Sequence, residues 1–191
     1  MQITVSGKNM DVGSALRNHV ESRVAHEVEK YLDRVTDASI VFSKEAHLVR
    51  TDINMHAGTH SRILIKSKGE AGDAYISFNT AADKIEKQLR RYKRKIKNHH
   101  KPRIEAEEDK IYQARKYVLQ PEEEAHEEKE QPLIIAEKDT DVETLNVSDA
   151  VMKMDLADLP ALVFINKKNK RLNVVYKRAD GNISWVDPDV K

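Results

Sequence analysis

The sequence contains no cysteine among its 191 residues, which excludes disulfide bonds and thiol chemistry and is compatible with a reducing compartment. No apolar run approaches the roughly 18–20 residues that a membrane-spanning helix requires. Residues 1–13 lack the basic and then apolar order of a signal peptide. These absences predict a cytoplasmic protein without a membrane partner.

Catalytic motifs are missing as well, since the chain has no Walker A loop, GxGxxG, GxSxG or HExxH. His56 with His60, and His99 with His100, form two histidine pairs without the further ligands that a metal site normally has. We therefore expect no enzyme, no metal, no cofactor and no small-molecule substrate. A metal-dependent enzyme that uses His56, His60 or His99 is the alternative from another class.

The formal net charge of +1 hides a strong segregation of charge along the chain. Residues 1–101 hold 19 Lys and Arg against 12 Asp and Glu, whereas residues 102–191 hold 14 against 20. Such asymmetry indicates a polyanionic partner for the basic half. Without a membrane signal, nucleic acid is the first candidate.

The stretch 73–101 predicts one long amphipathic helix that Asp73 caps, because apolar residues recur at alternating spacings of three and four. Turning each residue by about 100° places a band of cations opposite this stripe. The apolar positions are Tyr75, Phe78, Ala82, Ile85, Leu89, Tyr92 and Ile96, and the cations are Lys84, Lys87, Arg91, Arg94 and Lys95, with Arg90 and Lys97 on one flank.

A charged helix face is often simply solvated, but this band has one sign, with Asp83 and Glu86 as its only nearby acids. Like charges four residues apart destabilise an isolated helix by a few tenths of a kcal/mol. A face that carries this cost is better explained by phosphate contacts. Arg17, Arg23 and Lys30 extend the band on an earlier helix. The predicted sheet lacks the adjacent aromatic residues of an RRM, which favours recognition of RNA shape and backbone.

The first 101 residues predict the order β-α-β-β-β-α in an α+β fold. Strands are expected at 2–7, around Ala38–Phe42, at Ile53–Met55 and at Ile63–Ile65, with a helix at 14–34 that Gly13 or Ser14 caps. A hairpin is expected at 57–59, and a break at 69–72. A four-stranded sheet with both helices on one face would bury both apolar stripes.

Beyond this basic domain (1–101), the pattern predicts a flexible acidic linker (102–131) and a small C-terminal α+β domain (132–191). The seven-residue spacing of Ile104, Ile111 and Val118 is compatible with a short helix in the linker. The last domain should contain strands at 133–136, 161–165, 172–176 and 183–186, and a helix at 147–158 that Ser148 caps. About 60 residues give a marginal core, so homodimerisation is expected.

Two sequence motifs resemble one known family. Asp73-Ala74-Tyr75, followed by residues 84–93 (KIEKQLRRYK), is similar to the long-helix motif of bacterial ribosome hibernation promoting factors. Phe164-Ile165-Asn166 and residues 173–178 (NVVYKR), with Asp180-Gly181, resemble the C-terminal signature of the family's long form. In place of the family's usual Ala-Ile-Asp the chain has Ser77-Phe78-Asn79.

The resemblance implies a factor that is not an enzyme and acts in stress or stationary phase. It implies an N-terminal domain that binds the 30S subunit and its 16S rRNA near the decoding centre, across the path of mRNA and tRNA. It also implies a C-terminal domain that homodimerises and draws two ribosomes into an inactive 100S pair. The expected rRNA-binding residues are Lys84, Lys87, Arg90, Arg91, Lys93, Arg94, Lys97, Arg17 and Arg23, and the expected dimer residues are Leu162, Phe164, Val174, Tyr176 and Trp185.

Two further readings stay open at this point. A general structured-RNA-binding protein or RNA chaperone would share the basic helix but would show no preference for ribosomes. An interaction adaptor would use the C-terminal domain to recruit a different protein, and its C-terminal domain would be monomeric.

Overall fold

The computed structural model of the chain describes residues 1–32, 35–57, 63–98, 111–120 and 133–189. These residues form two compact units, each with a sheet of its own. The first sheet has the strand order β1-β2-β3-β4 and the second the order β5-β6-β7-β8-β9. The predicted α+β class is confirmed.

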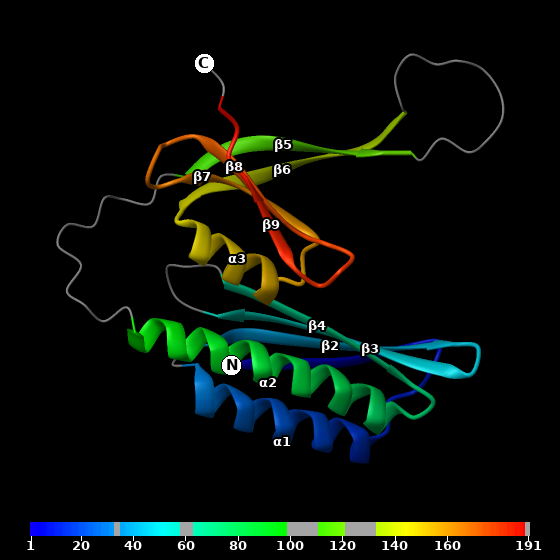
Figure 1. Cartoon of the computed structure of the whole chain (residues 1–191). Helices are drawn as coiled ribbons and strands as arrows, with labels where there is room; N and C mark the ends of the chain where they lie inside the picture. Colours follow the sequence, from blue (N-terminus) through cyan, green and yellow to red (C-terminus); the bar gives the residue numbers. More distant parts are fainter. Residues whose placement is uncertain (33–34, 58–62, 99–110, 121–132, 190–191) are drawn as a thin grey trace. The chain divides into compact units, whose positions relative to one another are not determined.

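The first unit follows the predicted β-α-β-β-β-α order. Its elements are β1 (Gln2–Lys8), α1 (Ser14–Tyr31), β2 (Val35–Glu45), β3 (Leu48–Ala57), β4 (Ile63–Ala71) and α2 (Ala74–Asn98). β1 pairs in parallel with β2, while β2–β3 and β3–β4 are antiparallel. Both helices cover the same face of the sheet (Figure 1). The two apolar stripes are therefore buried against one layer of strands, as the sequence predicts.

The core lies between this sheet and its helices because each strand alternates buried and exposed side chains. Ile40, Phe42, Ile65, Phe78 and Leu89 have no exposed surface. The opposite face of the sheet is polar and carries the outward positions of all four strands. The helix layer and the opposite face of the first sheet are thus two chemically distinct surfaces of this unit.

Asp73 caps α2 as predicted, since its Oδ1 accepts hydrogen bonds from the backbone amides of Tyr75 at 2.8 Å and Ile76 at 3.1 Å. One other boundary differs from the prediction. α1 ends at Tyr31, because Leu32 is extended with φ −125° and ψ 132°. The hairpin expected at 57–59 has only Ala57 within the described residues, and Ala57 pairs with Ile63.

The break predicted at 69–72 begins later in the structure, because β4 continues through Gly69 to Ala71 and only Gly72 of this range lies between β4 and α2. A Cβ at Gly69 would lie 2.0 Å from the Ser77 carbonyl oxygen and 2.8 Å from the Ala81 backbone nitrogen. Glycine therefore lets α2 pack directly on β4 at this point. Two buried hydroxyl contacts also join α2 to the sheet: Thr51 Oγ1 on β3 with Ser77 Oγ at 2.5 Å, and Ser67 Oγ on β4 donating to the Ala81 carbonyl at 2.8 Å.

Replacing Gly69 by alanine should destabilise the first unit by about 3 kcal/mol, because the added methyl group forces backbone away from backbone. Urea unfolding followed by far-UV circular dichroism would measure the loss. Gly72→Ala is the matched control, since a Cβ at Gly72 meets nothing within 4 Å. Equal midpoints for the two variants would contradict the packing role of Gly69.

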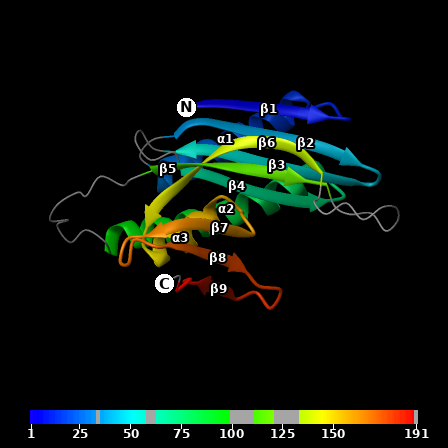
Figure 2. The same ribbon diagram turned by 90° about the horizontal axis from the view of Figure 1, so that it is seen from above.

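The remaining elements are β5 (Ile111–Leu119), β6 (Ile134–Leu145), α3 (Val147–Leu156), β7 (Ala161–Asn166), β8 (Leu172–Lys177) and β9 (Ile183–Val186). Of these, residues 151–162 group with the first compact unit, and the others belong to the second. Figure 2 shows β7, β8 and β9 side by side. The Asp180-Gly181 hairpin is confirmed, with Gly181 at φ 82° between antiparallel β8 and β9.

Three expectations for this part of the chain are corrected. Residues 111–119, placed in the linker and weighed as a helix, form a strand that pairs antiparallel with β6. The strand expected at 133–136 is the start of a 12-residue strand. The cap of α3 is Asn146 rather than Ser148, because Asn146 Oδ1 accepts the Asp149 amide hydrogen bond at 2.8 Å.

Candidate nucleic-acid interface and self-association surface

The long helix α2 turns a band of cations to solvent on the side away from its buried stripe. Phe78, Ala82, Ile85 and Leu89 are buried against the sheet. Five of the predicted cations are exposed, and we call them the α2 cationic band: Lys84, Lys87, Arg90, Arg91 and Arg94. The structure thus brings these predicted positions together on one helix surface.

The other three predicted α2 cations differ from this band, and Lys95 among them is half-buried although it was expected in the band. Lys93 is half-buried, and its Nζ donates a hydrogen bond to the Lys30 backbone carbonyl on α1. Lys93 therefore helps to hold the two helices together. The side chain of Lys97 lies outside the described residues. Within the band itself, Lys84 donates from Nζ to the Lys68 backbone carbonyl on β4 at 2.6 Å.

The two positions predicted on α1 do not share a face, because six residues correspond to about 240° of rotation around a helix. Arg17 is exposed. Arg23 is half-buried and points toward α2, where it forms ion pairs with carboxylates. The sequence pattern predicts that both arginines are exposed cations, but only Arg17 is exposed.

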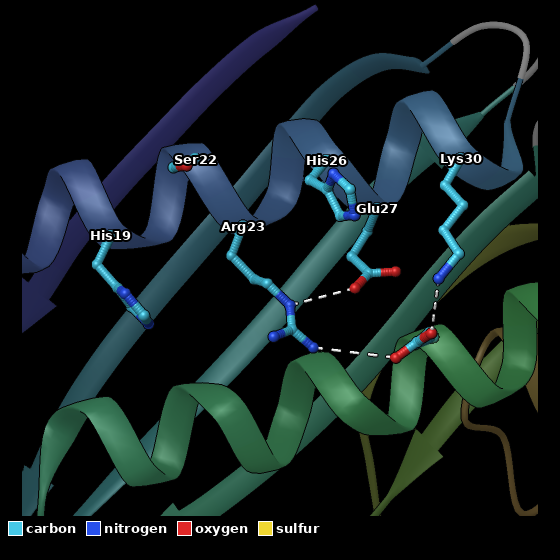
Figure 3. A pocket seen from close by; sticks show the side chains of 7 residues that line it. His19, Ser22, Arg23, His26, Glu27 and Lys30 are labelled. Atoms are coloured by element: carbon cyan, nitrogen blue, oxygen red, sulfur yellow. Dashed lines mark hydrogen bonds and ion pairs between the residues drawn. The ribbon is translucent and has the colours of Figure 1, made fainter.

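A groove of about 550 Å³ runs between α1 and α2 (Figure 3). Arg23 Nη2 lies 3.1 Å from Asp83 Oδ1 and 3.9 Å from Glu86 Oε2, and Lys30 Nζ lies 3.1 Å from Glu86 Oε1. We call these four residues the α1–α2 clasp. The residues that line the groove are His19, Ser22, Arg23, His26, Glu27, Lys30 and Glu86.

The contacts within the clasp shift the pKa values of Glu86 and Lys30. Because Lys30 and the Tyr31 hydroxyl both donate to Glu86, the pKa of the Glu86 carboxyl lies below its usual value. The hydrogen-bonding neighbours Tyr31 and Glu86 raise the pKa of Lys30. Both groups are consequently charged at neutral pH, and Lys30 and Glu86 form an ion pair.

Glu27 is the least expected member of the groove, since the sequence suggests a surface acid that interrupts the basic patch. It is only 5% exposed, and its Oε1 accepts a hydrogen bond from Arg23 Nε at 3.1 Å. The four-residue spacing between Arg23 and Glu27 is the local signal that predicts such a pair. Its burial follows from the packing of α1 on the sheet, which no local pattern reveals.

His19 on α1 contacts the Ser77-Phe78-Asn79 motif of α2. Its Nε2 lies 3.2 Å from Asn79 Oδ1, and its ring contacts Tyr75 and Phe78 edge-on at centroid distances of 5.2 and 5.7 Å. These contacts account for His19 structurally. Tyr75, predicted on the apolar stripe, is 38% exposed because it lies in the first turn of α2.

Of the two histidine pairs, only His56 lies within the described residues. His56 Nδ1 lies 2.9 Å from Asp37 Oδ2, and this hydrogen bond lowers the pKa of Asp37. His60 and His99 lie outside the described residues. Within the described ranges, no group of three potential metal ligands occurs, and no helix is long and apolar enough to cross a membrane.

In the second unit, two side-chain hydrogen bonds show which residues share a face of the β7–β9 sheet. Asn173 Oδ1 accepts from Asn166 Nδ2 at 2.9 Å and from Trp185 Nε1 at 2.8 Å, so these three side chains lie on one face. By alternation, Leu162, Phe164 and Val175 point to the same side. Phe164 and Val175 have no exposed surface. Phe164 is therefore a core residue of the single chain, unlike the interface residue that was expected.

The opposite face of the same sheet carries apolar side chains that remain accessible. Val174 pairs with Val186 across β8 and β9, and Thr144 on β6 pairs with Ile165 on β7. Tyr112 pairs with Val142, which continues this face onto β5. We call it the open sheet face of the second unit, and its apolar members are Tyr112, Val142, Val163, Ile165, Leu172, Val174, Tyr176 and Val186.

Of the five predicted dimer residues, only Val174 and Tyr176 lie on the open sheet face. Trp185 is 50% exposed but belongs to the other face, and Leu162 is half-buried there. The sequence motif therefore could not distinguish the two sides of the sheet. Tyr112 on β5 shares the open sheet face, but it was not considered because residues 102–131 were interpreted as a linker.

Known protein families match both the N-terminal and the C-terminal parts of the sequence. The model of the family described as Sigma 54 modulation protein / S30EA ribosomal protein matches residues 3–97, and the model of its C terminus matches residues 129–184. A ribosome hibernation promotion factor of Bradyrhizobium diazoefficiens is 39% identical over 194 residues, covering 98% of this chain and 95% of that protein.

A ribosome hibernation promotion factor of Rhizobium meliloti is 33% identical, covering 98% of this chain and 97% of that protein. The crystal structure of the Thermus thermophilus Protein Y N-terminal domain is 27% identical with a TM-score of 0.42, covering 48% of this chain and 99% of that one. With family models matching both of its parts and a relative 39% identical over nearly its whole length, the chain belongs to the Sigma 54 modulation protein / S30EA ribosomal protein family.

Proposed function

We propose that this protein binds the ribosome in the cytoplasm and holds it in a hibernating, inactive state. The first unit would contact 16S rRNA of the 30S subunit along the path of mRNA and tRNA near the decoding centre. The second unit would homodimerise and tie two ribosomes into a 100S pair. Inhibition would then come from occupied space, without catalysis.

The observation that carries the proposal is the α2 cationic band. Five exposed cations follow one side of a 25-residue helix, whose length of about 37 Å spans several phosphates of a folded RNA. Arg90 and Arg94 have the planar guanidinium groups that bind phosphates bidentately, whereas Arg91 Nη1 lies 3.1 Å from Asp155 Oδ2. The names of the relatives, ribosome hibernation promotion factors, support a ribosomal partner for this surface.

The open sheet face of the second unit supports self-association. Val163, Leu172, Tyr176 and Val186 are between 37% and 50% exposed in the single chain, so water contacts a continuous apolar patch. Patches of this kind commonly mark protein–protein contacts. A second copy that packs with the same face would bury it symmetrically, which is how most homodimers form.

Sedimentation of ribosomes in sucrose gradients tests the proposal directly. The full chain should co-sediment with isolated 30S subunits at low salt, and it should convert 70S ribosomes into a faster 100S species. Co-sedimentation should weaken steeply as salt rises, because released counterions drive phosphate binding. Absence of the chain from the 30S fraction at low salt would refute ribosome binding.

The second candidate, a general structured-RNA-binding protein or RNA chaperone, is favoured by the absence of any base-reading aromatic surface on the open face of the first sheet, within the residues that the structure describes. Competition distinguishes the two. An excess of unrelated duplex RNA should displace the chain from 30S subunits only weakly if the ribosome is its target. Equal displacement by unrelated RNA and by free 30S subunits would favour the general binder.

A further inference from the structure

The α1–α2 clasp withdraws two cations from the surface next to the α2 cationic band. Arg23 contacts three carboxylates, those of Glu27, Asp83 and Glu86. Lys30 contacts Glu86 (Figure 3). Glu86 also accepts a hydrogen bond from the Tyr31 hydroxyl at 3.0 Å. Each cation therefore already has a negative partner in the free protein.

The acids of the clasp belong to the same helix as the band. Asp83 precedes Lys87 by four residues, and Glu86 precedes Arg90 by four. Residues at this spacing are neighbours on a helix surface. Their carboxylates therefore border the band on its α1 side, and the clasp together with Glu27 holds two basic against three acidic side chains.

This arrangement has a consequence for RNA. A phosphate that approaches the groove meets carboxylates and must replace an existing ion pair to reach Arg23 or Lys30. Partly exposed ion pairs are individually weak. The repulsion between carboxylates and phosphates, however, acts on any RNA that lies across both helices. An RNA whose shape leaves the groove empty and follows the band alone avoids this repulsion.

We propose that Asp83 and Glu86 are specificity-determining residues for RNA binding. By holding Arg23 and Lys30 in the clasp, they lower the affinity for arbitrary RNA while they leave binding to a surface that fits the band nearly unchanged. Discrimination through a repulsive element is a general way to gain specificity. The inference rests on the proposed function and concerns the same surface of the protein.

The test compares the wild-type full chain with Asp83→Asn/Glu86→Gln in two binding titrations, each over a series of salt concentrations. The ligands are a duplex RNA of unrelated sequence and isolated 30S subunits. For the duplex, freeing two cations should steepen the slope of log K against log salt by up to about 1.8 and raise the affinity roughly tenfold or more at low salt. For 30S subunits the change should be several-fold smaller.

The matched control is Glu21→Gln/Glu29→Gln, which alters the net charge by the same amount at positions of α1 that do not line the groove. Circular dichroism confirms that each variant is folded. An unchanged duplex slope in the clasp variant, or the same gain in the control, would overturn the proposal. Failure of the wild-type chain to bind 30S subunits in the same titrations would instead refute the proposed function, so the two failures are distinguishable.

Discussion

Replacing Lys87, Arg90 and Arg94 together by alanine should weaken binding to 30S subunits roughly a thousandfold. The three side chains are exposed on one side of α2, so their loss removes phosphate contacts without disturbing the core. Charge-assisted hydrogen bonds contribute about 1.5 kcal/mol each at the lower end of their range, and 1.4 kcal/mol corresponds to a factor of ten in Kd. Binding titrations at fixed salt measure the effect.

The salt dependence of the same variant provides a second readout. Removing three phosphate contacts should reduce the slope of log K against log salt by about 2–3. The control is Lys8→Ala/Lys66→Ala/Lys68→Ala, which removes three cations from the open face of the first sheet. If the control loses as much affinity as the α2 variant, net charge and not the α2 cationic band governs binding.

Replacing Val174 and Tyr176 together by aspartate should abolish ribosome pairing while 30S binding persists. Both side chains lie on the open sheet face, where a second copy would have to bury two unpaired carboxylates. An unpaired buried charge costs several kcal/mol, which corresponds to more than a hundredfold loss of dimer affinity. Light scattering should show the mass fall from a dimer to the 21.9 kDa of one chain.

In sucrose gradients the same variant should remain with 30S subunits but give no 100S species. Ala179→Asp is the control, because Ala179 is exposed in the turn between β8 and β9, outside the open sheet face. A variant that still dimerises would show that a different surface joins the copies. Phe164 is unsuitable for this test, because truncating a fully buried phenylalanine costs about 3–5 kcal/mol of stability by itself.

The two variants separate the two proposed activities. The α2 variant should lose both 30S binding and pairing, since a dimer that cannot reach the ribosome cannot join two of them. The sheet-face variant should lose pairing alone. This asymmetry follows from the order of events in the proposed mechanism, in which each copy occupies its own small subunit.

The sequence alone determined the features that depend on local periodicity. The apolar stripe of α2, its Asp73 cap and the opposing cations follow from a repeat of 3.6 residues, which any helix imposes on its own side chains. The order β-α-β-β-β-α and the Asp180-Gly181 turn follow from equally local signals. These features predicted the exposed cations of α2 before any tertiary contact was known.

The tertiary structure decided which of these residues remain available. Arg23 lies 60 positions before Asp83 in the chain, so only the packing of α1 beside α2 shows that it is ion-paired. Alternation along β8 separates Val174 from Val175 but does not say which side is covered, and Phe164 was therefore assigned to an interface although it is core. β5 was missed because its partner, β6, follows after a long acidic segment. In each case a contact between distant parts of the chain, which a local pattern does not encode, settles the outcome.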